Sequence, residues 1–110
     1  MHWGGGTPTY LDPTEISEIT SYIKEKFRFS SEAEVSAEID PRGLVSEHLQ
    51  ALQLNGFNRI SMGVQDFNQG VLNAINRDQS ESITQQVINW SRLLEISGIN
   101  IDLIYGLPLQ

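Results

Sequence analysis

The sequence predicts an α/β fold in which about three to four parallel strands, flanked by helices, form part of a (β/α) barrel. Segments that alternate apolar and polar residues are separated by segments with helical spacing, which is typical of right-handed crossovers between parallel strands. Each expected strand also keeps one polar face, whereas the strands of an open doubly wound sheet are apolar on both faces. We therefore expect a sheet that curves around a polar interior, in preference to a flavodoxin-like sheet.

The first strand is expected at His2–Trp3, directly before a run of glycines, and a helix is expected to begin near Asp12. Asp12 can accept hydrogen bonds from the free amides of the first turn, and Glu15 lies where a capping box requires it. Pro13 suits the first helical position. The apolar face of this helix is expected to consist of residues at helical spacing: Ile16, Ile19, Ile23 and Phe27.

Further strands and helices are expected in this order: strand 33–39, helix 45–55, strand 59–64, a short helix from Asn68, a helix from Ser80 and strand 99–104. Alternation in these strands places the following apolar residues on one face: Val35, Ala37, Ile39, Ile60, Met62, Val64, Ile99, Ile101 and Leu103. The helices carry apolar residues at helical spacing: Val45, Leu49, Leu52, Val71, Leu72, Ile75, Ile83, Val87, Trp90 and Leu94. Gly56 and Gly98 are expected to end two of the helices.

The composition argues against several classes of function. The net charge of −7, from 14 acidic and 7 scattered basic side chains, argues against a nucleic-acid partner. No apolar run approaches the roughly 18 residues of a membrane-spanning helix, and the N-terminus shows no signal-peptide pattern, so a cytoplasmic protein is expected. The chain has no cysteine and its two histidines lie far apart in sequence, so we expect neither a thiol nucleophile nor metal ligands within it, and we assign a catalytic role to none of its residues.

Polar residues lie near the carboxyl ends of successive expected strands, where parallel barrels bind their ligands. On the faces assigned to the interior these residues are Glu38, Gln65 and Asp102. Gly5 and Gly6, followed by Thr7, form either a tight turn or a backbone that approaches a ligand closely. Arg77, in a turn between two helices, is either a solvated loop residue or a guanidinium that grips a carboxylate with two hydrogen bonds.

Four segments carry recognisable motifs: residues 2–9 (His-Trp-Gly-Gly-Gly-Thr-Pro-Thr), 38–42 (Glu-Ile-Asp-Pro-Arg), 58–68 (Asn-Arg-Ile-Ser-Met-Gly-Val-Gln-Asp-Phe-Asn) and 100–108 (Asn-Ile-Asp-Leu-Ile-Tyr-Gly-Leu-Pro). In this order they resemble the oxygen-independent coproporphyrinogen III oxidases, which are radical S-adenosylmethionine (SAM) enzymes. The resemblance extends over essentially the whole chain. It implies a partial barrel of the radical SAM type.

The resemblance also implies a role for each candidate residue. Contacts to SAM would come from backbone groups and a hydroxyl, and from polar side chains: Gly5, Gly6, Thr7, Glu38, Gln65 and Asp102. Arg77 would pair with the methionyl carboxylate. The family binds a second SAM near the glycine run, so which of the two molecules Gly5 contacts stays open.

The implied chemistry is reductive cleavage of SAM by a [4Fe–4S] cluster. The resulting 5′-deoxyadenosyl radical removes hydrogen from a propionate of coproporphyrinogen III, which then loses carbon dioxide and becomes a vinyl group. Repetition on a second propionate gives protoporphyrinogen IX in haem biosynthesis. The cofactors carry out the difficult chemistry, and the protein positions and shields them. The motifs do not indicate the electron donor, and the full-length protein is expected to be monomeric.

The family holds its cluster with a C-x-x-x-C-x-x-C motif in a loop that would precede Met1. We therefore interpret residues 1–110 as an internal segment of the radical SAM core domain, and we expect that this segment alone binds no cluster and has no turnover. The alternatives are a haem-binding chaperone of the same family, a radical SAM enzyme with another substrate, and a small α/β binding module. Trp3 and residues 40–42 and 65–67 favour the oxidases over the chaperones, which tend towards Asn-Pro and Gln-Ser-Phe in the last two segments.

Overall fold

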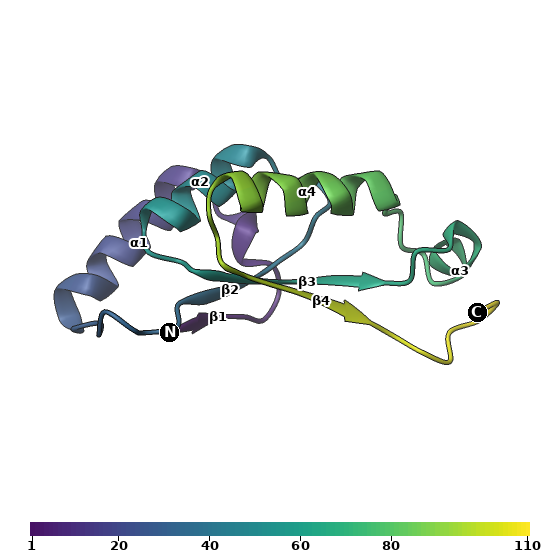
Figure 1. Ribbon diagram of the computed structural model, residues 1–110, viewed down its shortest axis with the longest axis horizontal. Coiled ribbons are helices and arrows are strands. Elements are labelled where there is room, and N and C mark those ends of the chain that lie inside the picture. Colours follow the sequence, from purple (N-terminus) through teal and green to yellow (C-terminus); the bar gives the residue numbers. More distant parts are fainter.

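The computed structural model describes residues 1–110 and places one sheet beneath a layer of helices (Figure 1). The elements in chain order are β1 (His2–Trp3), the 3-10 helix η1 (Pro8–Tyr10), α1 (Pro13–Lys26), β2 (Ser36–Ile39), α2 (Ser46–Leu54), β3 (Arg59–Gln65), α3 (Gln69–Ala74), α4 (Glu81–Leu93) and β4 (Gly98–Leu103). The predicted alternation of strands and helices is thereby confirmed. None of the helices combines the length and the apolar character needed to cross a membrane.

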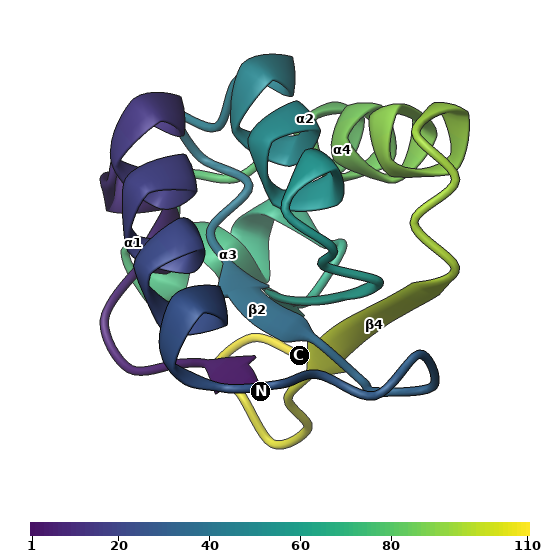
Figure 2. The same cartoon turned by 90° about the vertical axis from the view of Figure 1, so that its left-hand side faces the viewer.

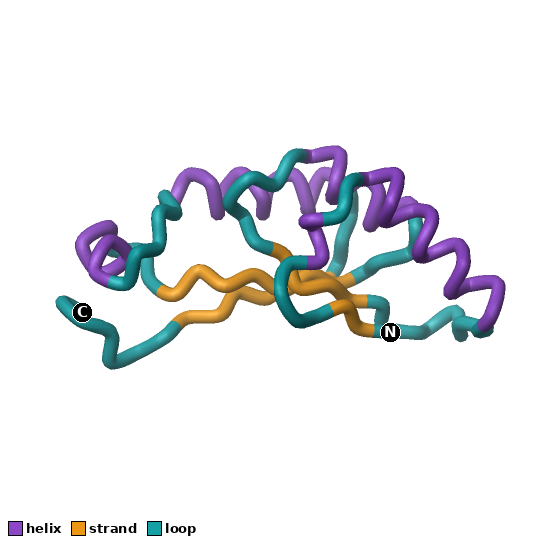
Figure 3. Tube along the Cα trace, turned by 180° about the vertical axis from the view of Figure 1, so that it is seen from behind, coloured by secondary structure: helices purple, strands orange, loops and turns teal.

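The sheet is wound in one direction only. Its four strands follow the order β1-β2-β3-β4, and each neighbouring pair is parallel. A doubly wound sheet reverses its strand order at one point and carries helices on both faces. Here each strand pairs with the next one in the chain, and the view from behind in Figure 3 shows the helices on a single face. The prediction of part of a (β/α) barrel is therefore confirmed.

The core lies between the sheet and the helices. α2 packs against both α1 and α4, and Figure 2 shows these helices arranged around the sheet. Side chains of the middle strands that face this layer are buried: Ala37, Ile39, Ile60, Met62 and Val64. Side chains of the helices pack into the same cluster: Ile16, Leu49, Leu52 and Val87. The alternation thus identified the buried face of β2 and β3, and the opposite face is the one that carries polar residues.

The apolar face predicted for α1 is only partly correct. Ile16 is buried and Ile23 is half-buried, but Ile19 and Phe27 are exposed. The remaining buried position of the helix is Thr20, whose hydroxyl donates to the Ile16 carbonyl at 2.7 Å. Because this hydrogen bond stays within the helix, a threonine can enter the core without another partner.

β2 begins later than predicted. Just before it, the side chain of Asn58, and not a neighbouring strand, forms hydrogen bonds with the backbone. The Asn58 side chain accepts from the Val35 amide at 3.0 Å and donates to the Ala33 carbonyl at 2.9 Å. The Val35 amide and the Ala33 carbonyl therefore have hydrogen-bond partners without pairing to a neighbouring strand, and β2 begins at Ser36. Alternation reports which side chains are buried, and Val35 is buried, but it does not report which atoms pair with the backbone.

Candidate functional site

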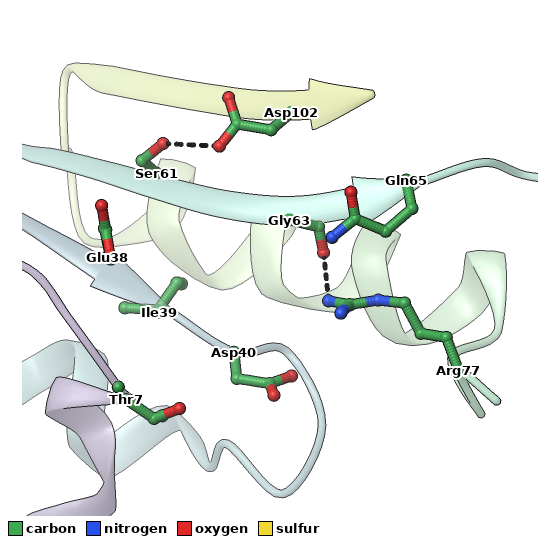
Figure 4. A pocket seen from close by; sticks show the side chains of 10 residues that line it. Thr7, Glu38, Ile39, Asp40, Ser61, Gly63, Gln65, Arg77 and Asp102 are labelled. Atoms are coloured by element: carbon green, nitrogen blue, oxygen red, sulfur yellow. Dashed lines mark hydrogen bonds between the residues drawn. The ribbon is translucent and has the colours of Figure 1, made fainter. Parts of the chain in front are cut away.

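The polar face of the sheet is hollowed at the carboxyl ends of β2, β3 and β4, where a pocket of about 280 Å3 opens (Figure 4). Its lining residues are Gly6, Thr7, Glu38, Ile39, Asp40, Ser61, Gly63, Gln65, Arg77 and Asp102. Small-molecule sites commonly have volumes of about 300–1,000 Å3. The pocket therefore lies at the lower end of the range for a small-molecule site.

The structure brings the predicted site residues together from distant parts of the chain. Those that line the pocket are Gly6, Thr7, Glu38, Gln65, Arg77 and Asp102. Gly5 lies beside them, and its amide donates to Oε2 of Glu38 at 3.2 Å. Gly5 and Gly6 have φ angles of 78° and 59°, which explains why glycine occupies both positions. No atom lies within 4 Å of where a Cβ would stand on either glycine, so their backbone borders open space.

The prediction missed some of the lining residues: Ile39, Asp40, Ser61 and Gly63. Ser61 and Gly63 lie on the polar face that alternation had already assigned to their strand, so the pattern could have found them. Asp40 directly follows β2 at its carboxyl end, which is also visible in the sequence. No pattern marks Ile39, because alternation assigns its side chain to the opposite face.

Glu38 is held between the glycine run and β1. Its Oε2 accepts from the Gly5 amide, while its Oε1 lies 3.6 Å from Nε2 of His2. The other ring nitrogen of His2 lies 2.7 Å from the hydroxyl of Ser36. A Cβ on Gly4 would lie 2.8 Å from Nε2 of His2, so a side chain at this position would displace the imidazole from the Glu38 carboxylate. These contacts fix the position of the Glu38 carboxylate at the edge of the pocket.

Asp102 lies on β4 and is oriented by its neighbours. The Asn100 amide donates to Oδ1 of Asp102 at 2.9 Å and to the Ser61 hydroxyl at 3.0 Å. The Ser61 hydroxyl lies 3.4 Å from Oδ2 of Asp102, as Figure 4 shows. Ser61 and Asn100 are directly paired in the register of β3 and β4. The carboxylate is thus held in place while its other lone pairs remain available to a ligand.

Gln65 lies on the polar face at the end of β3, where the strand is irregular. The register with β4 shifts between Gly63 and Gln65, so one additional residue is accommodated there. Gln65 has a φ of 71°, in the left-handed region that residues other than glycine rarely adopt. Figure 4 shows its side chain beside Gly63 at the pocket, and no side-chain hydrogen bond within the chain involves its Oε1 or Nε2 atoms.

Arg77 supplies the positive charge of the pocket. Its Nε donates to Oε1 of Gln79 at 3.0 Å, and its Nη2 donates to the Gly63 carbonyl at 2.6 Å. The ion pairs of the chain do not include Arg77. Its pKa is lowered, first because partial burial disfavours the charged form and second because Arg42 lies nearby. An anion in the pocket would favour the charged form and so offset both effects.

Asp40, by contrast, is a carboxylate that is already paired. Arg42 donates from Nε to Oδ1 at 3.0 Å and from Nη2 to Oδ2 at 2.6 Å. These hydrogen bonds hold the pKa of Asp40 below its usual value and raise the pKa of Arg42. Because Arg42 satisfies this carboxylate, Asp40 forms no ion pair with Arg77, although its charge still favours the charged form of that guanidinium.

The pocket therefore combines an unpaired guanidinium with carboxylates and an amide that can still accept hydrogen bonds. The guanidinium suits a carboxylate or a phosphate, and the acceptors suit hydroxyl or amino groups. No group of His, Cys, Asp or Glu side chains is arranged to hold a metal ion. The chemistry fits a ligand that carries an anionic group at one end and hydroxyl groups elsewhere.

Comparison with known proteins identifies the family. The family model of the radical SAM superfamily matches residues 1–110. The chain belongs to this superfamily. Curated relatives of this radical SAM chain include the oxygen-independent coproporphyrinogen III oxidases of Escherichia coli K12, at 48% identity over 110 residues, and of Helicobacter pylori J99, at 50% over 111 residues. Each match covers 100% of this chain and 24% of the relative, so the chain spans about a quarter of the relatives' length.

A solved structure supports the same assignment. Coproporphyrinogen III oxidase (HemN) from Escherichia coli, described as a radical SAM enzyme, matches with a TM-score of 0.93 and 49% sequence identity. The match covers 99% of this chain and 25% of that one. The predicted partial barrel of the radical SAM type and the resemblance to this group of enzymes are therefore confirmed. Membership of the superfamily implies SAM and a [4Fe–4S] cluster as cofactors. Because the chain has no cysteine, the cluster's thiolate ligands are not among these residues.

Proposed function

We propose that the pocket is part of a SAM site, and that residues 1–110 are an internal segment of a radical SAM core domain. One observation carries this proposal: the half-buried guanidinium of Arg77 lines the pocket, and no carboxylate of the chain is paired with it. The methionyl group of SAM ends in a carboxylate, and its ribose carries hydroxyl groups. SAM would therefore supply the anion that Arg77 lacks and hydroxyl donors for the acidic residues.

The geometry of the predicted residues supports a division of roles. Arg77 pairs with the methionyl carboxylate through the N–H groups that it does not use within the chain. Polar contacts to the ribose and its surroundings come from the side chains at the strand ends: Glu38, Gln65 and Asp102. The open space beside Gly5 and Gly6 lets the ligand lie along their backbone, with the Thr7 hydroxyl following them.

When bound, the [4Fe–4S] cluster supplies the electron for reductive cleavage of SAM. The residues of this chain bind and orient the molecule that is cleaved. Arg77 holds the methionyl end, while Asp102, itself held by Asn100, receives the sugar end. Fixing a flexible ligand at both ends restricts it to a reactive arrangement and lowers the entropic part of the barrier.

The substrate is proposed from the relatives. Curated relatives at 42–50% identity are named oxygen-independent coproporphyrinogen III oxidases. We propose that the whole protein converts coproporphyrinogen III to protoporphyrinogen IX by oxidative decarboxylation of propionates to vinyl groups, in the cytoplasm and as a monomer. The pocket residues contact SAM in this proposal and do not identify the oxidised molecule. A radical SAM enzyme with another substrate and a haem chaperone of the same family are therefore the alternatives.

The test of the site is equilibrium binding of SAM to the full-length protein and its variants. Arg77→Ala and Asp102→Asn should each weaken binding about tenfold or more, because each removes a hydrogen bond to a charged group. Arg92→Ala is the matched control, since Arg92 is an exposed arginine near the end of α4, and it should bind as the wild type does. Unchanged affinity in both pocket variants would show that the site is assigned wrongly.

The test of the substrate is anaerobic turnover of the reconstituted protein. Release of carbon dioxide from coproporphyrinogen III with formation of protoporphyrinogen IX supports the oxidase. Tight haem binding without decarboxylation supports the chaperone. SAM cleavage that coproporphyrinogen III does not stimulate supports an enzyme with another substrate.

A further inference from the structure

We propose that Gln79, supported by Thr84, is a positioning residue that presents the guanidinium of Arg77 to a ligand carboxylate. This inference rests on the proposed SAM site and deepens it. Gln79 lies between α3 and α4, and only 1% of its surface is exposed. A fully buried glutamine is uncommon and must satisfy its amide inside the protein. Its hydrogen-bond partners therefore show what it is positioned to do.

All polar atoms of the Gln79 side chain serve the network around Arg77. Oε1 accepts from Nε of Arg77 at 3.0 Å, while Nε2 donates to the Gly63 carbonyl at 3.3 Å and to the Thr84 hydroxyl at 3.0 Å. The same Gly63 carbonyl accepts from Nη2 of Arg77 at 2.6 Å, the bond drawn in Figure 4. If the amide were reversed, its NH2 group would face the N–H of Arg77, so the network determines its orientation.

This network leaves one side of the guanidinium free. Arginine has five N–H donors in a planar fork, and the side formed by Nε and Nη2 is taken by Gln79 and Gly63. The remaining side, formed by Nη1 and Nη2, has the parallel donors that bind a carboxylate bidentately. Gln79 thus fixes the plane of the guanidinium and directs its unused side.

The acceptors in the network are neutral, so the positive charge of Arg77 remains available to attract an anion. Oε1 of Gln79 and the Gly63 carbonyl satisfy Arg77 without an opposing charge. Arg42 shows the contrast, because its guanidinium is neutralised by the carboxylate of Asp40 at 2.6 Å. A glutamate at position 79 would pair with Arg77 in the same way and compete with the ligand.

The experiment compares two ligands in the full-length protein: SAM and its decarboxylated analogue, which lacks only the carboxylate. Gln79→Met keeps the size of the side chain and removes its hydrogen bonds, so it should weaken SAM binding about tenfold. Affinity for decarboxylated SAM should not change. Gln79→Glu should also weaken SAM selectively, and in an Arg77→Ala background Gln79→Met should have no further effect.

Thr84→Val and Thr20→Val form a matched pair of controls. Both threonines are buried, but Thr84 accepts from Gln79, whereas the Thr20 hydroxyl bonds only within α1. Thr84→Val should weaken SAM selectively by a smaller factor than Gln79→Met, and Thr20→Val should leave both affinities unchanged. If Gln79→Met does not fold, Gln79→Glu and Thr84→Val carry the same comparison.

The outcomes separate this inference from the proposed function. Equal weakening of both ligands by the Gln79 variants would mean that Gln79 has only a structural role, and unchanged binding of both would mean that it has none. Either result overturns the inference while SAM binding by the wild type stands. A wild-type protein that binds no SAM overturns the proposed function itself.

Discussion

Gln65 stands in a left-handed backbone conformation, with a φ of 71°, although its side-chain amide has no hydrogen-bond partner within the chain. Such a conformation costs a residue with a Cβ roughly 1–2 kcal/mol, and the side chain does not offset this cost by a hydrogen bond of its own. Strained residues that persist without a structural reason are concentrated at ligand sites. We therefore predict that relief of the backbone strain at this position raises stability, while loss of the amide weakens SAM binding.

Comparison of Gln65→Gly with Gln65→Ala isolates the free-energy cost of the left-handed backbone conformation, because both variants lose the side-chain amide and only glycine lacks a Cβ. The folded-state cost of roughly 1–2 kcal/mol is partly offset by the greater entropy of glycine in the unfolded chain, about 0.4–1 kcal/mol. We expect Gln65→Gly to be more stable than Gln65→Ala by about 1 kcal/mol, the difference between these terms. Both variants should bind SAM more weakly than the wild type and to the same extent.

The assay is urea unfolding of the full-length protein and its two variants, combined with the SAM titration. A common m-value would show that the midpoints can be compared as stabilities. If the alanine variant is as stable as the glycine variant, the backbone at Gln65 is not strained. If neither variant binds SAM more weakly, the amide does not contribute to the site and the explanation for the strain is wrong.

Two further predictions concern the Asp40–Arg42 pair. Arg42→Met should free the Asp40 carboxylate to compete with SAM for Arg77, so SAM binding should weaken. Adding Asp40→Asn to this variant should restore SAM binding. A double variant that still binds SAM weakly would exclude competition as the cause. Because the pKa of Asp40 is lowered by its hydrogen bond from Arg42, its stabilising effect is present above the unfolded pKa of about 3.9 and is lost as the pH falls through the lower folded value. Below about pH 4 the wild type should therefore lose stability more steeply than Asp40→Asn, and identical pH profiles in urea unfolding would contradict this.

Much of the fold could be predicted because the deciding interactions are local. Asp12 and Glu15 cap α1 as the sequence indicates, each accepting from the backbone amide of the other at 2.9 Å. Ile60, Met62 and Val64 are buried at every second position of β3, as alternation requires. The period of the apolar residues reports which face is buried, and that is a property of adjacent residues in the chain.

Part of the site could be predicted for a simple geometric reason. Parallel strands all end at one edge of the sheet, so polar residues at successive strand ends must approach one another. That rule brings Glu38, Gln65 and Asp102 to one pocket. The role of Arg77 could not be predicted in this way. From the residues alone, a solvated loop arginine cannot be distinguished from a ligand-binding one, and only the family resemblance suggested that Arg77 binds a ligand.

By itself, the sequence determined the order of the elements, the buried faces of β2 and β3 and the strand ends that form the pocket, since these depend on spacing along the chain. Only the tertiary structure decided how the pocket side chains are held. The pairing of Asn100 with Ser61 depends on the register between β3 and β4, and the arrangement of Arg77 and Gln79 depends on the Gly63 carbonyl in β3, to which both donate. These hydrogen bonds join residues that are distant in sequence or lie in irregular loops. No repeating pattern encodes them, because each depends on the packed positions of several elements at once.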